Sequence, residues 1–222
     1  MMINSSNVPS YTLGEERFNS ISHGIGFCLS VVALVLGILQ ASQYGDSWCV
    51  VSATVYGCSL ILLYCMSTLY HCVTNPSVKK VFRVFDHTTI FLLIAGTYTP
   101  ITLVTLRSVI GWIIFGIVWC TAVLGIILNA ISIEKFKKFS MIAYIAMGWA
   151  VVIGVKPLIH NMKMGGLLLL LLGGVFYTVG IIFYNKKKLK YMHSIWHLFV
   201  LAGSIFHYFA VYLYILPLDK LS

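Results

Sequence analysis

The stretch GGLLLLLLGGVFYTVGIIFY, residues 165–184, contains no charged side chain and is apolar along nearly its whole length. A transmembrane helix needs about 20 such residues to cross the hydrocarbon core of a bilayer. Six further stretches of this kind flank it, and they are too long and too continuously apolar for barrel strands. The sequence therefore predicts seven spans, near 21–41, 48–70, 85–105, 109–129, 140–158, 165–184 and 193–215.

The composition agrees with this prediction. The chain is 59% hydrophobic and only 9% charged, and its mean hydropathy is +0.93. A soluble domain carries about a quarter of its residues as charged side chains. Short polar connections separate the spans, and only residues 1–20 precede the first one. We therefore expect an all-α integral membrane protein in which residues 1–222 form a single seven-helix bundle and residues 1–20 form a cytoplasmic segment.

The positions of the basic residues predict the orientation. Lys and Arg accumulate in cytoplasmic loops. Alternation of the seven spans places Arg17, Lys79, Lys80, Arg83, Lys135, Lys137, Lys138, Lys186, Lys187, Lys188 and Lys190 on the side of the N-terminus, and Arg107, Lys156, Lys163 and Lys220 on the other. The N-terminus is therefore expected inside and the C-terminus outside. Most of the net charge of +9 reflects this topology, and its spread over several loops argues against nucleic acid binding.

Ionisable residues gather in the cytoplasmic third of the predicted bundle. His193 and His197 are four residues apart at the start of the last span, so they share one helical face. His71 ends the second span and Asp86 begins the third, which places both at the same depth. Such side chains are costly inside a membrane and usually mark a functional site.

Three histidines at one depth suit zinc, which in catalytic sites takes three protein ligands and keeps a fourth position open for water. His71, His193 and His197 are the expected ligands, and Asp86 is the expected base or orienter for the water. Ser67 lies one turn before His71, and its hydroxyl is expected to form a hydrogen bond with the water, a ligand or a substrate carbonyl. Three further residues at the start of the first span are expected to orient the groups around the metal ligands or to fix this span against them: Glu16, Asn19 and His23.

Each residue alone also has a structural explanation. His71 at a helix end is a favourable partner for the helix dipole, and Asp86 near a helix start is a natural cap. The joint pattern of a His-x3-His pair, a third histidine and an aspartate at one depth favours a metal site over these separate explanations. Three histidines with water would also accept other first-row metals.

These motifs resemble a known family. Glu16-x2-Asn19-x3-His23, Ser67-x3-His71 with Asp86 downstream, and His193-x3-His197 are similar to the signature motifs of the progestin and adipoQ receptor superfamily. The strings from Asp86 to Pro100 and from His193 to His207 resemble its bacterial branch, the hemolysin III family. The resemblance implies seven helices with a cytoplasmic N-terminus. It also implies zinc on His71, His193 and His197, with Asp86 holding the metal-bound water.

The resemblance leaves several functions open. Animal relatives are receptors with proposed ceramidase activity, and bacterial members take their name from cytolytic behaviour and are also linked to membrane lipid balance. Our leading hypothesis is a zinc-dependent hydrolase of lipid amides or esters, or a regulator of membrane lipid homeostasis. The alternatives are a pore-forming cytolysin and a metal-dependent sensor without turnover.

Membrane lipids are the expected partners and the plasma (inner) membrane is the expected location. Glycines spaced by seven in residues 165–184 would serve packing within the bundle or between protomers, so the oligomeric state is open.

Overall fold

The computed structural model describes residues 11–186 and 189–218, and all regular structure in these ranges is helical. Lys187, Lys188 and Lys220, which entered the charge count above, lie outside the described residues. The elements are α1 (Leu13–Tyr44), α2 (Ser47–Cys72), α3 (Pro76–Pro100), a π-helical turn η2 (Ile101–Thr105), α4 (Val109–Ile131), α5 (Ile133–Gly148), a 3-10 turn η3 (Ala150–Gly154), α6 (Val155–Asn161), α7 (Met164–Asn185) and α8 (Met192–Tyr214).

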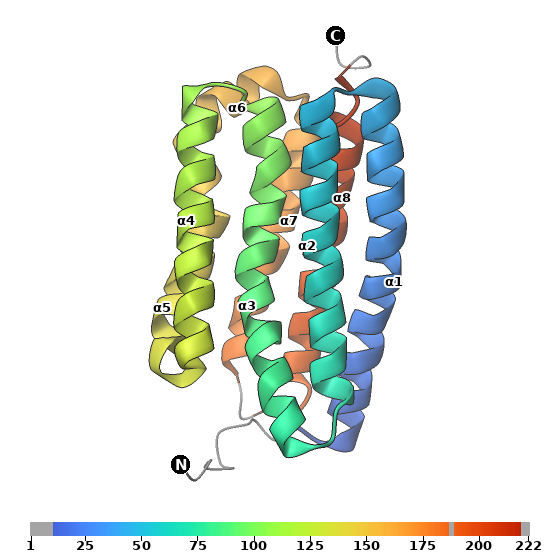
Figure 1. Ribbon diagram of the computed structural model, residues 1–222, viewed down its shortest axis with the longest axis vertical. Coiled ribbons are helices and arrows are strands. Elements are labelled where there is room, and N and C mark those ends of the chain that lie inside the picture. The colour runs from blue at the N-terminus through green and yellow to red at the C-terminus, as the bar shows by residue number, and fades with distance from the viewer. Residues whose placement is uncertain (1–10, 187–188, 219–222) are drawn as a thin grey trace.

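Within these ranges, seven helical units are long and apolar enough to cross a membrane, since α3 continues into η2 and α5 continues through η3 into α6. The expected seven-helix fold is therefore confirmed. α1 packs against α2 and α8, α3 lies between α2 and α4, and α7 packs mainly against α8 (Figure 1).

Several helices begin earlier than the predicted spans. Residues 13–20, expected in the N-terminal segment, belong to α1, and most of the expected connections 72–84 and 132–139 are helical as well. The cause is local capping by polar side chains. The Asn75 carboxamide accepts bonds from the first amides of α3, where Pro76 follows, and the Ser132 hydroxyl accepts from Lys135. A helix can thus extend beyond the hydrocarbon, and the hydropathy of the sequence marks only its apolar part.

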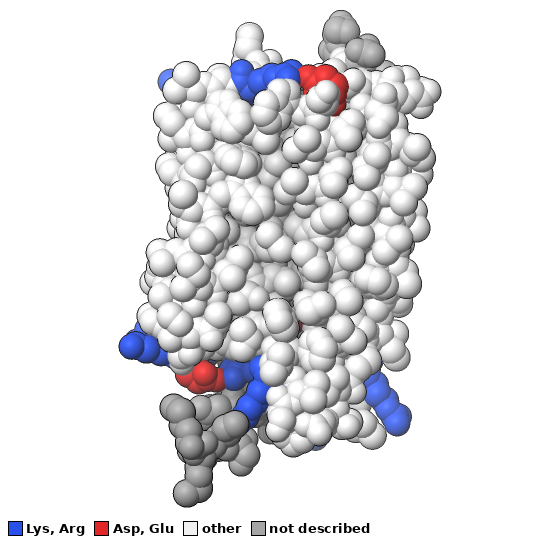
Figure 2. Space-filling model, in the orientation of Figure 1, with Lys and Arg blue, Asp and Glu red and all other residues white. Residues whose placement is uncertain are grey.

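Charged side chains lie at the two ends of the bundle, and the face shown in Figure 2 is almost free of them in between. At the end that holds the N-terminus, basic residues occupy the starts of α1, α3 and α5 and the last turn before α8. At the opposite end, Arg107 pairs with Asp46 at 2.7 Å. The excess of basic residues at the N-terminal end places that end in the cytoplasm.

Three glycines of α7, spaced by seven residues, face α8. Gly166, Gly173 and Gly180 are the buried residues of this helix. A Cβ atom on Gly173 would lie 2.1 Å from the imidazole of His207, and one on Gly180 would lie 2.8 Å from Trp196. Small residues allow membrane helices to approach closely. The glycine stripe therefore serves packing within the bundle.

The fifth span is broken near its middle, where α5 ends at Gly148 and η3 begins at Ala150. Backbone groups released at such a break must find partners, because lipid offers none. The Tyr98 hydroxyl of α3 meets this need by donating to the Gly148 carbonyl at 2.9 Å and accepting from the Val151 amide at 2.8 Å. The break is thus fixed to α3, and Tyr98, Gly148 and Trp149 line a cavity beside it.

Candidate metal centre

Three histidines meet at the cytoplasmic end of the bundle. His71 comes from the last turn of α2, and His193 and His197 come from the first turns of α8. One nitrogen of each ring lies within 4.8 Å of the others, and the Nε2 atoms of His193 and His197 are 3.1 Å apart. We call these three residues the histidine triangle. The structure thus brings together the three residues that the sequence predicted as ligands.

The nitrogen atoms of the triangle fit a metal ion. Nδ1 of His71 lies 2.6 Å from the Glu16 carboxylate, while Nε2 of the same ring is buried without a hydrogen-bond partner. A carboxylate on one ring nitrogen leaves the other free to bind a metal. In a tetrahedral zinc site with Zn–N bonds of about 2.0–2.1 Å, neighbouring nitrogens lie about 3.3 Å apart. The residues present therefore fit zinc after a contraction of the triangle around the ion.

Glu16 is itself held by a lysine. Lys79 of α3 donates to its carboxylate at 2.7 Å and also to the carbonyls of Tyr70 and Val73 at the end of α2. The ammonium group therefore caps α2 and neutralises the carboxylate behind His71. Lys79 was not among the site residues predicted from the sequence, because its role as a cap depends on the turn between α2 and α3.

The other two residues predicted behind the triangle contact α8. The Ser194 hydroxyl donates to Oδ1 of Asn19 at 2.6 Å. The imidazole of His23 stacks on that of His197, with ring centroids 3.6 Å apart and planes inclined by 15°. All three helices that form the site, α1, α2 and α8, are thus joined by buried polar contacts. The roles that we predicted for Glu16, Asn19 and His23 remain predictions, and the geometry places each of them beside the triangle.

Asp86 and Ser67 lie on the side of the triangle that faces the interior of the bundle. Both line the cavity together with His193 and His197. Ser67 is buried, and Asp86 lies 3.3 Å from Nδ1 of the neighbouring His87. His87 also lines the cavity, and its carbonyl accepts from Tyr144. His207 of α8 has Nε2 3.0 Å from the Leu170 carbonyl of α7.

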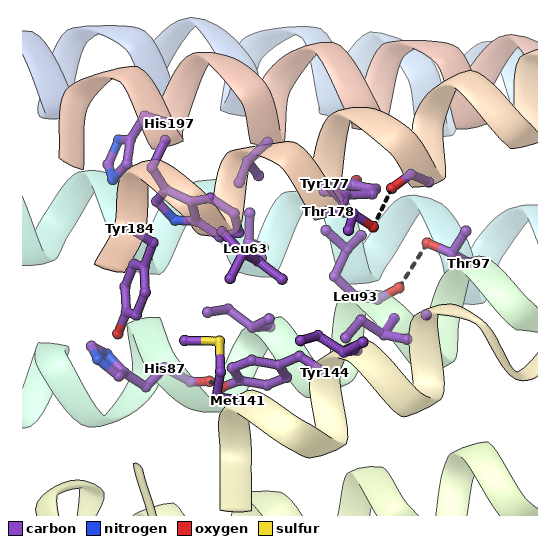
Figure 3. A pocket seen from close by; sticks show the side chains of 18 of the residues that line it. Leu63, His87, Leu93, Thr97, Met141, Tyr144, Tyr177, Thr178, Tyr184 and His197 are labelled. Atoms are coloured by element: carbon purple, nitrogen blue, oxygen red, sulfur yellow. Dashed lines mark hydrogen bonds between the residues drawn. The ribbon is translucent and has the colours of Figure 1, made fainter. Parts of the chain in front are cut away.

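The cavity runs outward from the triangle between α3 and α5 on one side and α7 and α8 on the other, with a volume of about 130 Å³. In Figure 3, His197, Tyr184 and His87 lie at one end and Thr97 and Thr178 at the other. The side chains between them are mostly apolar, including Leu63 and Leu93. The site thus combines polar and ionisable groups at its inner end with a long apolar chamber.

Two residues at the N-terminal end of the site were missed in the sequence. The ring of Tyr11 stacks on His193, with centroids 4.9 Å apart and planes inclined by 21°. Burial raises the pKa of the Tyr11 phenol far above its usual range, so the phenol is neutral at physiological pH. Glu15 is buried and accepts bonds from both Thr12 and Tyr191. The pattern Thr12-x2-Glu15 is a capping box, and this motif would have revealed the start of α1.

Comparisons with known proteins identify the family of the chain. The family described as haemolysin-III related matches residues 11–208 of the chain. Hemolysin-3 of Bacillus cereus is 48% identical over 203 residues, covering 91% of this chain and 93% of the relative. The Hemolysin-3 homolog of Bacillus subtilis (strain 168) is 43% identical over 212 residues, covering 96% and 100%.

A more distant relative comes from an animal. The monocyte to macrophage differentiation factor of Homo sapiens is 30% identical over 220 residues, covering 94% of this chain and 88% of the relative. The matched region contains the histidine triangle, Asp86 and the cavity. The chain is therefore a multi-pass membrane protein that belongs to the haemolysin-III related family, as the motifs of its sequence predicted.

Proposed function

We propose that the protein is a zinc-dependent hydrolase of lipid amides or esters in the plasma membrane. The observation that carries the proposal is the position of the histidine triangle at the inner end of an apolar cavity that also contains Asp86 and Ser67. The carbonyl groups of membrane lipids lie near the boundary between head groups and hydrocarbon. A site at this depth can therefore receive an acyl carbonyl while the attached chain extends into the cavity.

Hydrolysis of an acyl linkage adds water across the bond between the carbonyl carbon and its nitrogen or oxygen. One proton leaves the attacking water, and one proton must reach the departing amine or alcohol. A zinc ion on the three histidines would supply Lewis acidity, which polarises the carbonyl and makes water a better nucleophile at neutral pH. In this proposal the Asp86 carboxylate accepts the proton and returns it, and the Ser67 hydroxyl donates to a substrate oxygen.

The metal site is tested by elemental analysis of the protein purified in detergent. We expect about one zinc per chain in the wild type and loss of that zinc in His197→Ala. His160→Ala is the matched control, because His160 is exposed at the opposite end of the bundle. A folded wild-type protein that remains free of metal after zinc is supplied would contradict the metal site.

Turnover is tested separately, by incubating the zinc-loaded protein with ceramides and phospholipids and analysing the products by mass spectrometry. Asp86→Asn should keep its zinc and lose at least about a hundredfold in rate, the usual contribution of a general base. A wild type that holds zinc and releases no fatty acid from any lipid would contradict the hydrolase and favour a metal-dependent sensor.

The name of the Bacillus relatives suggests a cytolytic activity. An aqueous pore needs polar groups along its whole length, whereas the wall of the cavity described here is mostly apolar. We therefore place pore formation second. Conductance or lysis that persists in Asp86→Asn, together with an absence of lipid products from the wild type, would reverse this order.

A further inference from the structure

The histidine triangle has two faces with different surroundings. One face belongs to the cavity, which is lined by His193, His197 and Asp86. Residues of the opposite face, among them His71 and Tyr11, are outside the cavity lining. Tyr11 covers this second face, since its ring is 4.9 Å from the ring of His193 and 5.7 Å from that of His71. A flat aromatic ring thus lies between the triangle and the cytoplasmic end of the bundle.

The two faces of the histidine triangle differ in how easily a hydrated cation can reach them. The walls of the cavity are mainly apolar, and a hydrated divalent cation that passed through them would lose most of its solvation. The face under Tyr11 is bordered by Glu16 and Lys79, whose side chains are 16% and 13% exposed. A hydrated cation approaching from the cytoplasm would meet this polar ion pair in place of an apolar wall, and Glu16 also contacts His71.

Glu15 fixes the position of Tyr11. One oxygen of its carboxylate accepts from the amide and the hydroxyl of Thr12, at 2.8 and 2.7 Å, so the backbone directly after Tyr11 is held. The other oxygen accepts from the amide of Tyr191 at 2.7 Å. Glu15 as a whole residue is 7% exposed. One buried carboxylate therefore ties the segment that carries Tyr11 to the residue in front of α8.

Tyr191, the residue that Glu15 holds in front of α8, has an unusual backbone conformation. Tyr191 has φ 61° and ψ 4°, in the left-handed region that non-glycine residues rarely adopt. This backbone conformation costs free energy, so it persists only where surrounding contacts fix it. Tyr191 stands two residues before His193. The hydrogen bond from Tyr191 to Glu15 thus stabilises the turn that precedes His193. The bonds from Thr12 to Glu15 hold the neighbouring Tyr11, whose ring covers His193.

We propose that Tyr11 is a gate through which the metal ion exchanges with the cytoplasm, and that Glu15 is the latch that keeps the gate closed. The inference rests on the proposed metal site, and it is independent of whether the site hydrolyses lipids. Tyr11 is assigned no bond to the metal. Removal of its ring should therefore change how fast the ion enters and leaves, and should leave the equilibrium affinity unchanged.

The test measures zinc exchange in lipid nanodiscs. Zinc-loaded protein is mixed with excess EDTA and the zinc that remains bound is followed over time, while uptake is followed after zinc is added to the metal-free protein. An aromatic contact is worth about 0.5–1.5 kcal/mol, which corresponds to about a two- to tenfold change in rate. Tyr11→Ala should raise both rates by this factor with Kd unchanged. Tyr11→Phe keeps the ring and should keep the wild-type rates.

Glu15→Gln tests the latch. An amide offers one acceptor oxygen where the carboxylate offers two, so it can hold Thr12 or Tyr191 and releases the other. Both exchange rates should rise toward those of Tyr11→Ala. The exposed Glu134, which pairs with Arg83 at the same end of the bundle, provides the matched control Glu134→Gln, and this variant should behave as the wild type.

The direction of exchange provides a second measurement. EDTA does not cross membranes, so it should remove zinc quickly from inverted vesicles, whose cytoplasmic face is outside, and slowly from right-side-out vesicles.

Unchanged rates in Tyr11→Ala would overturn the gate while leaving the metal site intact. Faster release with a weaker Kd and unaltered uptake would also overturn it, because Tyr11 would then merely support His193. A wild type that never loads zinc would instead remove the proposed metal site itself.

Discussion

Glu16 and His71 form a carboxylate–imidazole pair, with Oε2 2.6 Å from Nδ1 and the opposite ring nitrogen buried without a partner. The two residues come from α1 and α2 and are 55 positions apart in the chain. The carboxylate fixes which nitrogen of His71 carries the proton, so Nε2 presents its lone pair. Lys79 holds the carboxylate in place from α3.

Replacement of Glu16 by Gln should weaken zinc binding by about 10- to 100-fold, the usual effect of losing a group that orients a metal ligand. The amide is similar in size to the carboxylate, so packing is preserved. Competition with a chelator of known affinity measures the change, and Glu134→Gln serves as the control for a glutamate remote from the triangle. An affinity equal to that of the wild type would show that His71 needs no orienting partner.

The close contact between α7 and α8 predicts a sharp difference between two neighbouring glycines. Gly173→Ala would place a methyl group 2.1 Å from His207 and should destabilise the protein by about 1–3 kcal/mol, as overpacking does. A methyl group on Gly174 would meet no atom within 4 Å, so Gly174→Ala should be neutral or slightly stabilising. Thermal unfolding in detergent compares the two variants. Equal melting temperatures would contradict the assigned packing.

Tyr98→Phe should destabilise the broken fifth span. The variant removes one donor and one acceptor and leaves the amide of Val151 without its partner, a loss of about 1–3 kcal/mol for a buried group. Hydrogen exchange should increase selectively at residues 149–152. Tyr212→Phe is the matched control, because the ring contact with Tyr208 survives this change. Protection that is unchanged in Tyr98→Phe would mean that the break is stable without the tyrosine.

Asp46 at the outer end of the bundle gives a prediction about pH. Burial opposes its ionisation, but the Cys49 amide and the Arg107 guanidinium outweigh burial and lower the pKa of the carboxyl group. A lowered pKa in the folded state stabilises the protein above the unfolded value of about 3.9, and the benefit is lost as the pH falls through the folded value. Asp46→Asn keeps a residue that caps helices well. Its unfolding temperature should therefore be lower than that of the wild type at pH 7, by the equivalent of up to about 1 kcal/mol, and equal to it once the pH lies below the folded-state pKa of Asp46. A difference that persists at low pH would exclude the charge as its cause.

The depth of the site could be predicted from the sequence. Hydropathy gives the spans, helical periodicity places His193 and His197 on one face, and alternation of direction brings His71 to the same level. Contacts that depend on side-chain direction could not be predicted. Adjacent glutamates, Glu15 and Glu16, point to different helices, since Glu15 contacts the turn before α8 and Glu16 contacts α2 and α3.

The break between α5 and α6 was equally hidden, because its residues are as apolar as a continuous helix would be. Val151 and its neighbours carry no Pro or charge that would signal the change of backbone. The partner that makes the break tolerable, Tyr98, lies 53 positions away in the chain. Hydropathy records how much of a span is apolar and contains no information about where its backbone bonds end.

The contacts between α1 and α8 have a consequence for biosynthesis. Glu15 and Tyr191 are 176 positions apart, and among the described helices the one that carries His193 and His197 is synthesised last. The polar face of α1, including Asn19 and His23, therefore lies in the membrane without its partners on α8 until that helix has been inserted. A nascent chain that stops before residue 192 holds a single member of the triangle. Zinc bound at the proposed site would consequently report that translation and insertion had proceeded through α8.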